Sequence, residues 1–214
     1  MLAACLAVIV VACFLASRVQ SSSGRVRVTE ITLPTQNGQW VTADLFRPLS
    51  ATSETPAPLV VPGFQRSKET QANVAIQLAR RGVVVINIDP YAQGSSSSSL
   101  SRRSATEEGY GMFPVVDYAA DTGNLNYVDK FSIGTTGHSA GGNAAIQGAS
   151  HFGEEAIKQN TPSKLHSVFV SGYVLTLTSK TLRTVRSSVG LSYALHGEGA
   201  YRNELKNGDL RLAP

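Results

Sequence analysis

A serine between two glycines at a fixed spacing is the first feature of the sequence that could do chemistry. Residues 137–141 read Gly-His-Ser-Ala-Gly, so Gly137 lies two residues before Ser139 and Gly141 lies two residues after it. A turn tight enough to expose one serine strains its backbone, and side chains at the two glycine positions would collide. The pattern therefore predicts an exposed Ser139 hydroxyl that acts as a nucleophile toward a carbonyl carbon.

The neighbouring residues are of the kind that would position such a serine. Residues 131–137 read as a strand and residues 140–152 as a helix of small residues, so Ser139 would lie between a strand and a helix. The Ala140 N–H, at the start of that helix, would face the negative charge that develops on a substrate carbonyl oxygen. The alternative is a glycine-rich helix cap without a catalytic role.

An earlier Pro-Gly turn supports a resemblance to a known family. Residues 59–61 read as a short buried strand that ends at Pro62 and Gly63. With this turn and the glycine–serine segment, the chain resembles the α/β-hydrolase family, in particular its dienelactone-hydrolase-like and acyl-esterase-like members. The resemblance extends from residue 25 to about residue 173. In that family the glycine–serine turn is called the nucleophile elbow.

The resemblance implies further roles by position. In the family, a His-Gly turn after the earlier strand supplies a second oxyanion N–H, which implies that role for Phe64, with Gln65 as its alternative. The chain has Pro62 in place of the family's histidine, and a proline has no N–H to donate. The resemblance also places Asp89 in the polar loop after the family's fourth strand, as a structural residue and not as the catalytic acid.

The remaining elements alternate between strands and helices. A hairpin is predicted around Asn37-Gly38, and the later apolar runs predict buried parallel strands. This order indicates a three-layer α/β fold with a mostly parallel sheet behind an antiparallel entrance hairpin. The serine-rich residues 94–101 are expected to form a mobile loop. The predicted strands are 25–33, 40–47, 59–61, 83–88, 131–137 and 165–171, and the predicted helices are 68–81, 112–123 and 140–152.

No base for Ser139 is found where the family would have one. Family members place an acid and then a histidine after the nucleophile, on loops that follow later strands. After Ser139 only one strand is predicted, and the chain ends without a structural stop signal, so we expect the sheet to be truncated before both residues. Residues 173–214 would then be an insertion or a lid-like segment. His138, held beside the nucleophile, is expected to point elsewhere, while His151 falls at the end of the following helix and His166 inside a strand. The weak candidates that remain inside the chain are His196 and, weaker still, Glu198 or Asp209.

The first 18 residues are expected to lie in a membrane. Residues 2–16 are uncharged and almost wholly apolar, and a serine-rich linker, residues 19–24, separates them from a hydrolase domain in residues 25–214. A membrane anchor is favoured, and the alternatives are a cleaved signal sequence or a lipoprotein acylated at Cys13. Arginines after the apolar run favour a cytoplasmic domain, but charges encoded upstream would alter that balance, so the side of the membrane stays open.

Composition excludes several other classes of protein. The 214 residues suit one domain, and 42% of them are hydrophobic. The net charge of +4 comes from scattered cations and not from a basic face that would bind nucleic acid. Both cysteines, Cys5 and Cys13, lie in the apolar run, which leaves the domain without a disulfide or a cysteine metal site. No metal and no organic cofactor is implied.

These observations predict a membrane-anchored serine hydrolase of carboxylic esters or thioesters, acting on small-molecule acyl substrates. Ser139 would be the nucleophile, and the Phe64 and Ala140 N–H groups would bind the oxyanion. An acyltransferase on the same scaffold would use the same residues. The alternative from another class is a non-catalytic, membrane-anchored protein or degenerate fragment that keeps the hydrolase fold without a triad.

Overall fold

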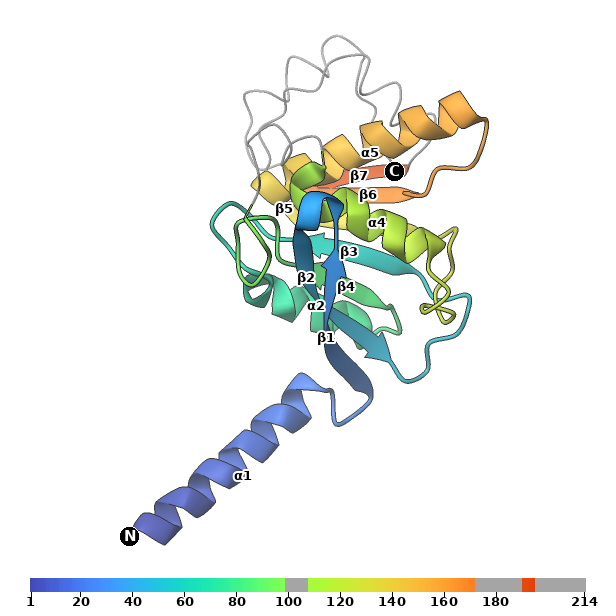
Figure 1. Cartoon of the computed structure of the whole chain (residues 1–214). Coiled ribbons are helices and arrows are strands. Elements are labelled where there is room, and N and C mark those ends of the chain that lie inside the picture. Colours follow the sequence, from blue (N-terminus) through green and yellow to red (C-terminus); the bar gives the residue numbers. More distant parts are fainter. Residues whose placement is uncertain (99–107, 172–189, 195–214) are drawn as a thin grey trace.

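The computed structural model describes residues 1–98, 108–171 and 190–194, which form one mixed sheet with helices on both faces (Figure 1). The strands are β1 (Val26–Pro34), β2 (Trp40–Pro48), β3 (Ala57–Val61), β4 (Val85–Ile88), β5 (Ile133–His138), β6 (Ser167–Ser171) and β7 (Gly190–Ala194). Their order is β1-β2-β4-β3-β5-β6-β7. β1 and β4 are antiparallel to β2, and all the other neighbours are parallel. The predicted fold class is therefore confirmed.

The described helices also follow the predicted order. They are α1 (Leu2–Gln20), α2 (Ala72–Ala79), α4 (Met112–Asp121) and α5 (Ala140–Gln159), with 3-10 helices η1 (Gln36–Gly38), η2 (Lys68–Gln71) and η3 (Gly109–Gly111). The single helix predicted over residues 68–81 is divided into η2 and α2, because the backbone of Gln71, with φ at −110° and ψ at 3°, is not helical. α5 is longer than predicted and ends at Asn160, whose φ of 52° closes the helix in a left-handed conformation.

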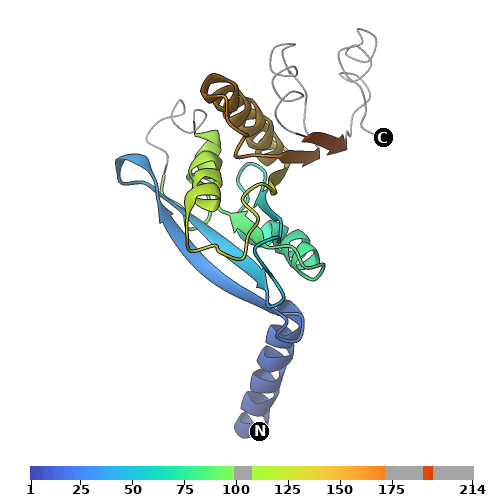
Figure 2. The same cartoon turned by 90° about the vertical axis from the view of Figure 1, so that its right-hand side faces the viewer.

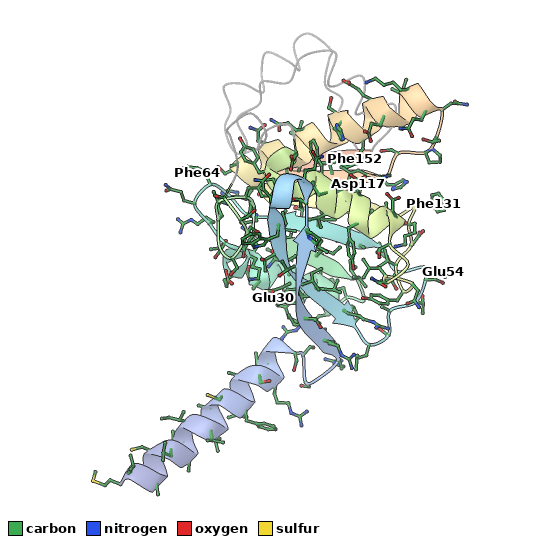
Figure 3. The ribbon with its side chains drawn as sticks, viewed as in Figure 1. Glu30, Glu54, Phe64, Asp117, Phe131 and Phe152 are labelled. Atoms are coloured by element: carbon green, nitrogen blue, oxygen red, sulfur yellow. The ribbon has the colours of Figure 1, made fainter. Side chains whose placement is uncertain are left out.

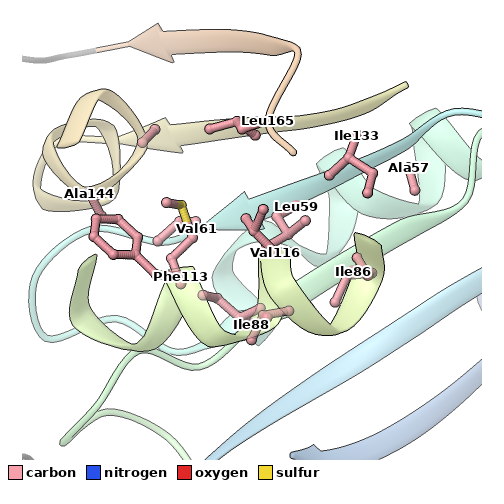
Figure 4. Packing of buried hydrophobic residues seen from close by; sticks show 14 of the residues in the cluster. Ala57, Leu59, Val61, Ile86, Ile88, Phe113, Val116, Ile133, Ala144 and Leu165 are labelled. Carbon is pink, nitrogen blue, oxygen red and sulfur yellow. The ribbon is translucent and has the colours of Figure 1, made fainter. Parts of the chain in front are cut away.

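Alternation along the strands separates two apolar layers. Leu59 and Val61 of β3 belong to the larger cluster with α4 and α5, whereas Val60 between them packs with α2 on the other face. Figure 2 shows α4 and α5 on one side of the sheet and α2 on the other. Figure 4 shows Phe113 and Val116 of α4 over the strand residues of the larger cluster. This arrangement is the three-layer architecture that the sequence predicts.

A strand lies within the segment where the sequence predicts an insertion. One strand is predicted after Ser139, but the described residues contain two, since β7 pairs parallel with β6 from Ser167↔Gly190 to Ser171↔Ala194. The residues of β7, Gly-Leu-Ser-Tyr-Ala, lack the continuous apolar run by which the other buried strands are found. The rest of the predicted insertion lies outside the described residues.

The first part of the serine-rich loop has hydrogen-bond partners in the sheet. Its described part, residues 94–98, is hydrogen-bonded to the start of β2. The hydroxyl of Ser96 accepts the Thr42 N–H at 2.8 Å, and the hydroxyl of Ser97 accepts the Trp40 N–H at 2.9 Å. Serine hydroxyls therefore supply the partners that the β2 backbone needs at this edge. Residues 99–101 lie outside the described residues.

α1 extends away from the sheet and has no buried residue (Figure 1). Residues Leu2–Val19 have a mean hydropathy of 2.5 and are the one stretch of the described chain long and apolar enough to cross a membrane. The end of the helix contacts the domain, where the Arg80 guanidinium donates to the Val19 carbonyl oxygen at 2.9 Å. The helix is compatible with an anchor and with a signal sequence.

Candidate active site

The carboxyl ends of four neighbouring parallel strands meet at one edge of the sheet. β4, β3, β5 and β6 are consecutive in the sheet order. β4 leads into residues 89–98, β3 into the Pro62–Gly63 turn and β5 into Ser139, while β6 ends at Ser171. This edge is where open α/β sheets bind their ligands. The candidate site is therefore built from segments that are far apart in the sequence.

Ser139 has a strained backbone between β5 and α5. Its φ is 55° and its ψ is −117°, a combination that favours glycine. A residue held in such a region costs on the order of 1–3 kcal/mol. The side chain is exposed, and the Ser139 carbonyl oxygen accepts the Asn143 N–H at 3.1 Å, within the first turn of α5. The sharp turn between strand and helix is therefore present, and it presents the serine to solvent.

Two glycines allow this turn to pack. A Cβ on Gly137 would overlap the backbone of Gly141, and a Cβ on Gly141 would overlap the carbonyl groups of Val61 and Pro62. The overlapped atoms belong to the backbone, so relief would require a shift of α5 or β3. The glycines thus let β5, α5 and the end of β3 approach one another.

Ser171 holds the other side of the elbow. The Ser139 N–H donates to the Ser171 carbonyl oxygen at 3.1 Å. The Nδ1 atom of His138 lies 3.2 Å from the Ser171 hydroxyl oxygen. The imidazole next to the predicted nucleophile is therefore bonded to β6, which agrees with the expectation that His138 points elsewhere.

The Pro62–Gly63 turn lies directly against the elbow. An ideal Cβ on Gly63 would be 3.5 Å from the Cβ of Ser139 and 3.4 Å from the His138 carbonyl oxygen. Phe64 follows with a side chain that is 73% exposed, and it projects at the edge of the domain in Figure 3. The structure thus brings the two turns that the sequence analysis singled out to the same place.

The three candidate oxyanion N–H groups differ in their partners. The Gln65 N–H is donated to Oε1 of Gln93 at 2.5 Å, so it is already used. The N–H groups of Phe64 and Ala140 have no hydrogen-bond acceptor within residues 1–98, 108–171 and 190–194. This difference favours Phe64 over Gln65, and the assignment of Phe64 and Ala140 to an oxyanion site stays a prediction.

Gln93 is a site residue that the sequence analysis missed. Its Nε2 donates to the Arg66 carbonyl oxygen at 3.0 Å and to the Gly63 carbonyl oxygen at 3.4 Å. Glutamine has no sequence motif for such a role. Its position in the sequence could have identified it. Gln93 follows β4 closely, and β4 and β3 are neighbouring parallel strands, so Gln93 lies at the same end of the sheet as the turn after β3.

No histidine of the described part contacts the Ser139 hydroxyl. His151 lies inside α5, not at its end as expected, because the helix continues to Gln159; its ring stacks on Phe113 at 4.5 Å. His166 lies one residue before β6, not within a strand, and burial lowers its pKa. His196, Glu198 and Asp209 lie outside the described residues.

Asp89 has the structural role that was expected of it. The fully buried carboxylate accepts the Lys68 N–H at 2.6 Å and the Ser95 N–H at 3.0 Å, and it lies 3.4 Å from the Lys68 ammonium. Burial acts to lower the pKa of Lys68, but pairing with Glu30, at 3.0 Å, and with Asp89 raises it overall. Within the described ranges, no cluster of three His, Cys, Asp or Glu residues could hold a metal ion.

Comparison with known proteins gives a family match and a set of similar folds. A sequence model of a family described as PET hydrolase-like matches residues 14–190. An esterase from Pyrobaculum calidifontis superposes with a TM-score of 0.55 at 27% identity, over 71% of this chain and 47% of its own. Dienelactone hydrolase from Anabaena variabilis superposes with a TM-score of 0.60 at 15% identity, over 87% of this chain and 81% of its own.

The extent of these matches is partial. An α/β-hydrolase from Penicillium superposes with a TM-score of 0.57 at 17% identity, over 70% of this chain and 47% of its own. The chain thus spans about half the length of the first of these solved structures. A search of curated protein sequences gives no match. The structural neighbours agree with the α/β-hydrolase fold that the sequence resembles.

Proposed function

We propose that this chain, which belongs to the PET hydrolase-like family, hydrolyses carboxylic esters with Ser139 as its nucleophile. The observation that carries the proposal is the strained backbone of Ser139, with φ at 55°, whose Cβ lies 3.5 Å from where an ideal Cβ on Gly63 would be. Strain of this kind persists in proteins where the surrounding structure enforces it, and it is concentrated at active sites.

The proposed reaction follows from the groups around Ser139. The hydroxyl oxygen attacks the ester carbonyl carbon while a histidine base takes its proton, and the negative oxygen that forms is bound by the Phe64 and Ala140 N–H groups. The tetrahedral intermediate collapses, the alkoxide leaves with the proton from the base, and water then hydrolyses the acyl-enzyme. None of the described histidines is placed to be this base.

The substrate class is inferred from chemistry and from the family. Carboxylic esters and thioesters both react through this acyl-enzyme, and the family description adds an aromatic polyester as a first substrate to try. An acyltransferase would differ only in the acceptor that attacks the acyl-enzyme. A non-catalytic protein with the same fold is the alternative from another class.

The experiment is labelling of the full chain with a fluorophosphonate, together with hydrolysis of a p-nitrophenyl ester. Labelling and turnover that disappear in Ser139→Ala would support the proposal, since loss of the nucleophile in a serine hydrolase removes roughly a million-fold in rate. No labelling of the 214-residue chain, together with no labelling of a version extended through any sequence encoded downstream, would favour the non-catalytic alternative. Labelling that survives Ser139→Ala would show that another residue is the nucleophile.

We also propose a division of the chain and a location for it. Residues 1–18 would anchor the chain in a membrane, and residues 25–214 would form the hydrolase domain. Residues 19–24 would be the linker between them. The support is that α1 is apolar and exposed along its length, and apolar side chains in that number are unfavourable in water. A signal sequence is the alternative.

A further inference from the structure

We infer that Gln93 is a positioning residue for the oxyanion turn, which we define as residues 63–66. One side-chain amide bonds to three backbone groups of this turn, and the turn carries Phe64, whose N–H is proposed to bind the oxyanion. The inference rests on the proposed function, because a positioned N–H matters only if a negative oxygen forms beside Ser139.

The Gln93 side-chain amide contacts the oxyanion turn through both its nitrogen and its oxygen. Oε1 of Gln93 accepts the Gln65 N–H at 2.5 Å, and Nε2 donates to the carbonyl oxygens of Arg66 at 3.0 Å and Gly63 at 3.4 Å. With an N–H on one side and two carbonyls on the other, only this orientation of the amide satisfies all three groups. Gln93 therefore bridges the turn on both sides of Phe64.

The turn needs such a constraint because part of its backbone is strained. Gln65 has a φ of 56°, in the left-handed region that glycine, asparagine and aspartate adopt most readily. The bond within the turn, from the Arg66 N–H to the Gly63 carbonyl oxygen, is 3.2 Å long. One internal bond is a weak restraint for an exposed turn, whereas three further bonds to one residue fix its orientation relative to β4.

Gln93 is itself held by an ordered loop. Its N–H donates to the Pro90 carbonyl oxygen at 3.0 Å, and its carbonyl oxygen accepts the Ser96 N–H at 3.2 Å. The Ser96 hydroxyl in turn donates to the Asp89 carbonyl oxygen at 2.6 Å. The hydrogen bonds within the segment after β4 thus fix the position of Gln93 and hold its side-chain amide opposite the oxyanion turn.

The consequence is a specific kinetic defect when the amide is lost. Without Gln93 the Gln65 N–H is free and the turn can rotate, so the Phe64 N–H is no longer held toward the elbow. Loss of one oxyanion donor lowers kcat by about 100- to 1000-fold, and a displaced donor should cost less, about 10- to 100-fold. KM should change little, because the ground-state carbonyl depends less on this bond than the oxyanion does.

The experiment compares Gln93→Met, Gln93→Glu and a matched control, Gln77→Met, in the full chain in detergent. Gln77 is an exposed residue of α2, away from the turn. Hydrogen exchange of the peptide around residue 65 tests the contact without any need for catalysis. Kinetics with a p-nitrophenyl ester test its consequence, with Ser139→Ala as the blank.

We expect Gln93→Met to accelerate exchange of the Gln65 amide and to lower kcat, while Gln77→Met changes neither. Gln93→Glu keeps the acceptor but loses the donors, so its kcat relative to wild type should be intermediate. This ratio should rise at acidic pH, where the protonated carboxyl regains a donor. Unchanged exchange in Gln93→Met would overturn the contact, and faster exchange with unchanged kcat would overturn the positioning role. Absence of Ser139-dependent turnover in the wild type would instead overturn the proposed function.

Discussion

The backbone N–H of Ser139 donates a 3.1 Å hydrogen bond to the carbonyl oxygen of Ser171, across the ends of β5 and β6. On its other side Ser139 lies against the turn after β3, where the lack of a side chain on Gly63 allows the close approach. The elbow is therefore held by both neighbouring strands of the sheet, and its conformation depends on contacts that mutation can remove one at a time.

The strain at Ser139 predicts that two inactive variants differ in stability. Ser139→Ala keeps a Cβ in the strained conformation, whereas Ser139→Gly relieves it. Allowing for the greater chain entropy of glycine in the unfolded state, Ser139→Gly should be more stable than Ser139→Ala by about 1 kcal/mol. Urea unfolding of both variants measures the difference. Equal or lower stability of the glycine variant would contradict the strain.

The packing of the elbow predicts a steric effect at Gly141. In Gly141→Ala the new methyl group would meet backbone carbonyls of β3, which should lower the stability by about 3 kcal/mol or more. Gly123→Ala is the control, since a Cβ there meets nothing within 4 Å and its φ is not in the left-handed region. Thermal unfolding should show a large loss for the first variant and almost none for the second.

The oxyanion assignment predicts a contrast between two substitutions of Phe64. Phe64→Ala removes an exposed side chain and keeps the N–H, so kcat should stay within about threefold of the wild type. Phe64→Pro removes the N–H and should lower kcat by about 100-fold or more. Circular dichroism serves as the folding control. Equal kcat values for the two variants would remove Phe64 from the oxyanion site.

The charge cluster at Lys68 predicts a pH-dependent effect of Asp44. Burial raises the pKa of Asp44 above its ordinary value, and the nearby Lys68, at 3.9 Å, does not cancel this. A raised carboxyl pKa means that the stability from this group is present at low pH and is lost as the pH rises through the folded-state pKa. Asp44→Asn should therefore be more stable than the wild type at pH 7, with a smaller gain near pH 4. A loss of stability at pH 7 would contradict this sign.

The exposed helix α1 predicts membrane association of the intact chain. The full-length protein should sediment with membranes and resist extraction by high salt, because apolar and not ionic contacts would hold it. Removal of residues 1–18 should release it. Recovery of the intact chain in the soluble fraction would count against an anchor, and a shortened mature chain there would indicate a signal sequence.

Local pattern predicts most of the sheet from the sequence. β3 and β4 are found within two residues because buried parallel strands are mostly apolar runs, and the hairpin is found from its alternation. β5, with the residues Ile-Gly-Thr-Thr-Gly-His, is found equally closely from its place just before the glycine–serine motif. The connection of the hairpin is longer than the two-residue turn expected at Asn37-Gly38, since η1 occupies it. β7 is missed because Ser192 and Gly190 interrupt its apolar pattern, and only its pairing with β6 identifies it as a strand.

The residues of the candidate site are predictable from the sequence only where a local backbone motif defines them. Gly137, Ser139 and Gly141 form a local motif whose steric reason can be read from the sequence, and the structure shows the overlap that any Cβ would cause. Gln93 could not be found this way, because its bonds to residues 63–66 depend on the tertiary pairing of β3 with β4. The bonds from the serine-rich loop to β2 could not be predicted for the same reason, since low complexity conceals them.

The positive φ of Ser139 also has an evolutionary consequence. Glycine would fit this position with less strain, so a lineage released from any need for the hydroxyl should gain stability by exchanging it for glycine. On the proposed role of Ser139, selection for the hydroxyl would keep serine at this combination of φ and ψ in spite of the strain. Among proteins of this fold, those with glycine at the elbow are expected to be the catalytically inactive ones.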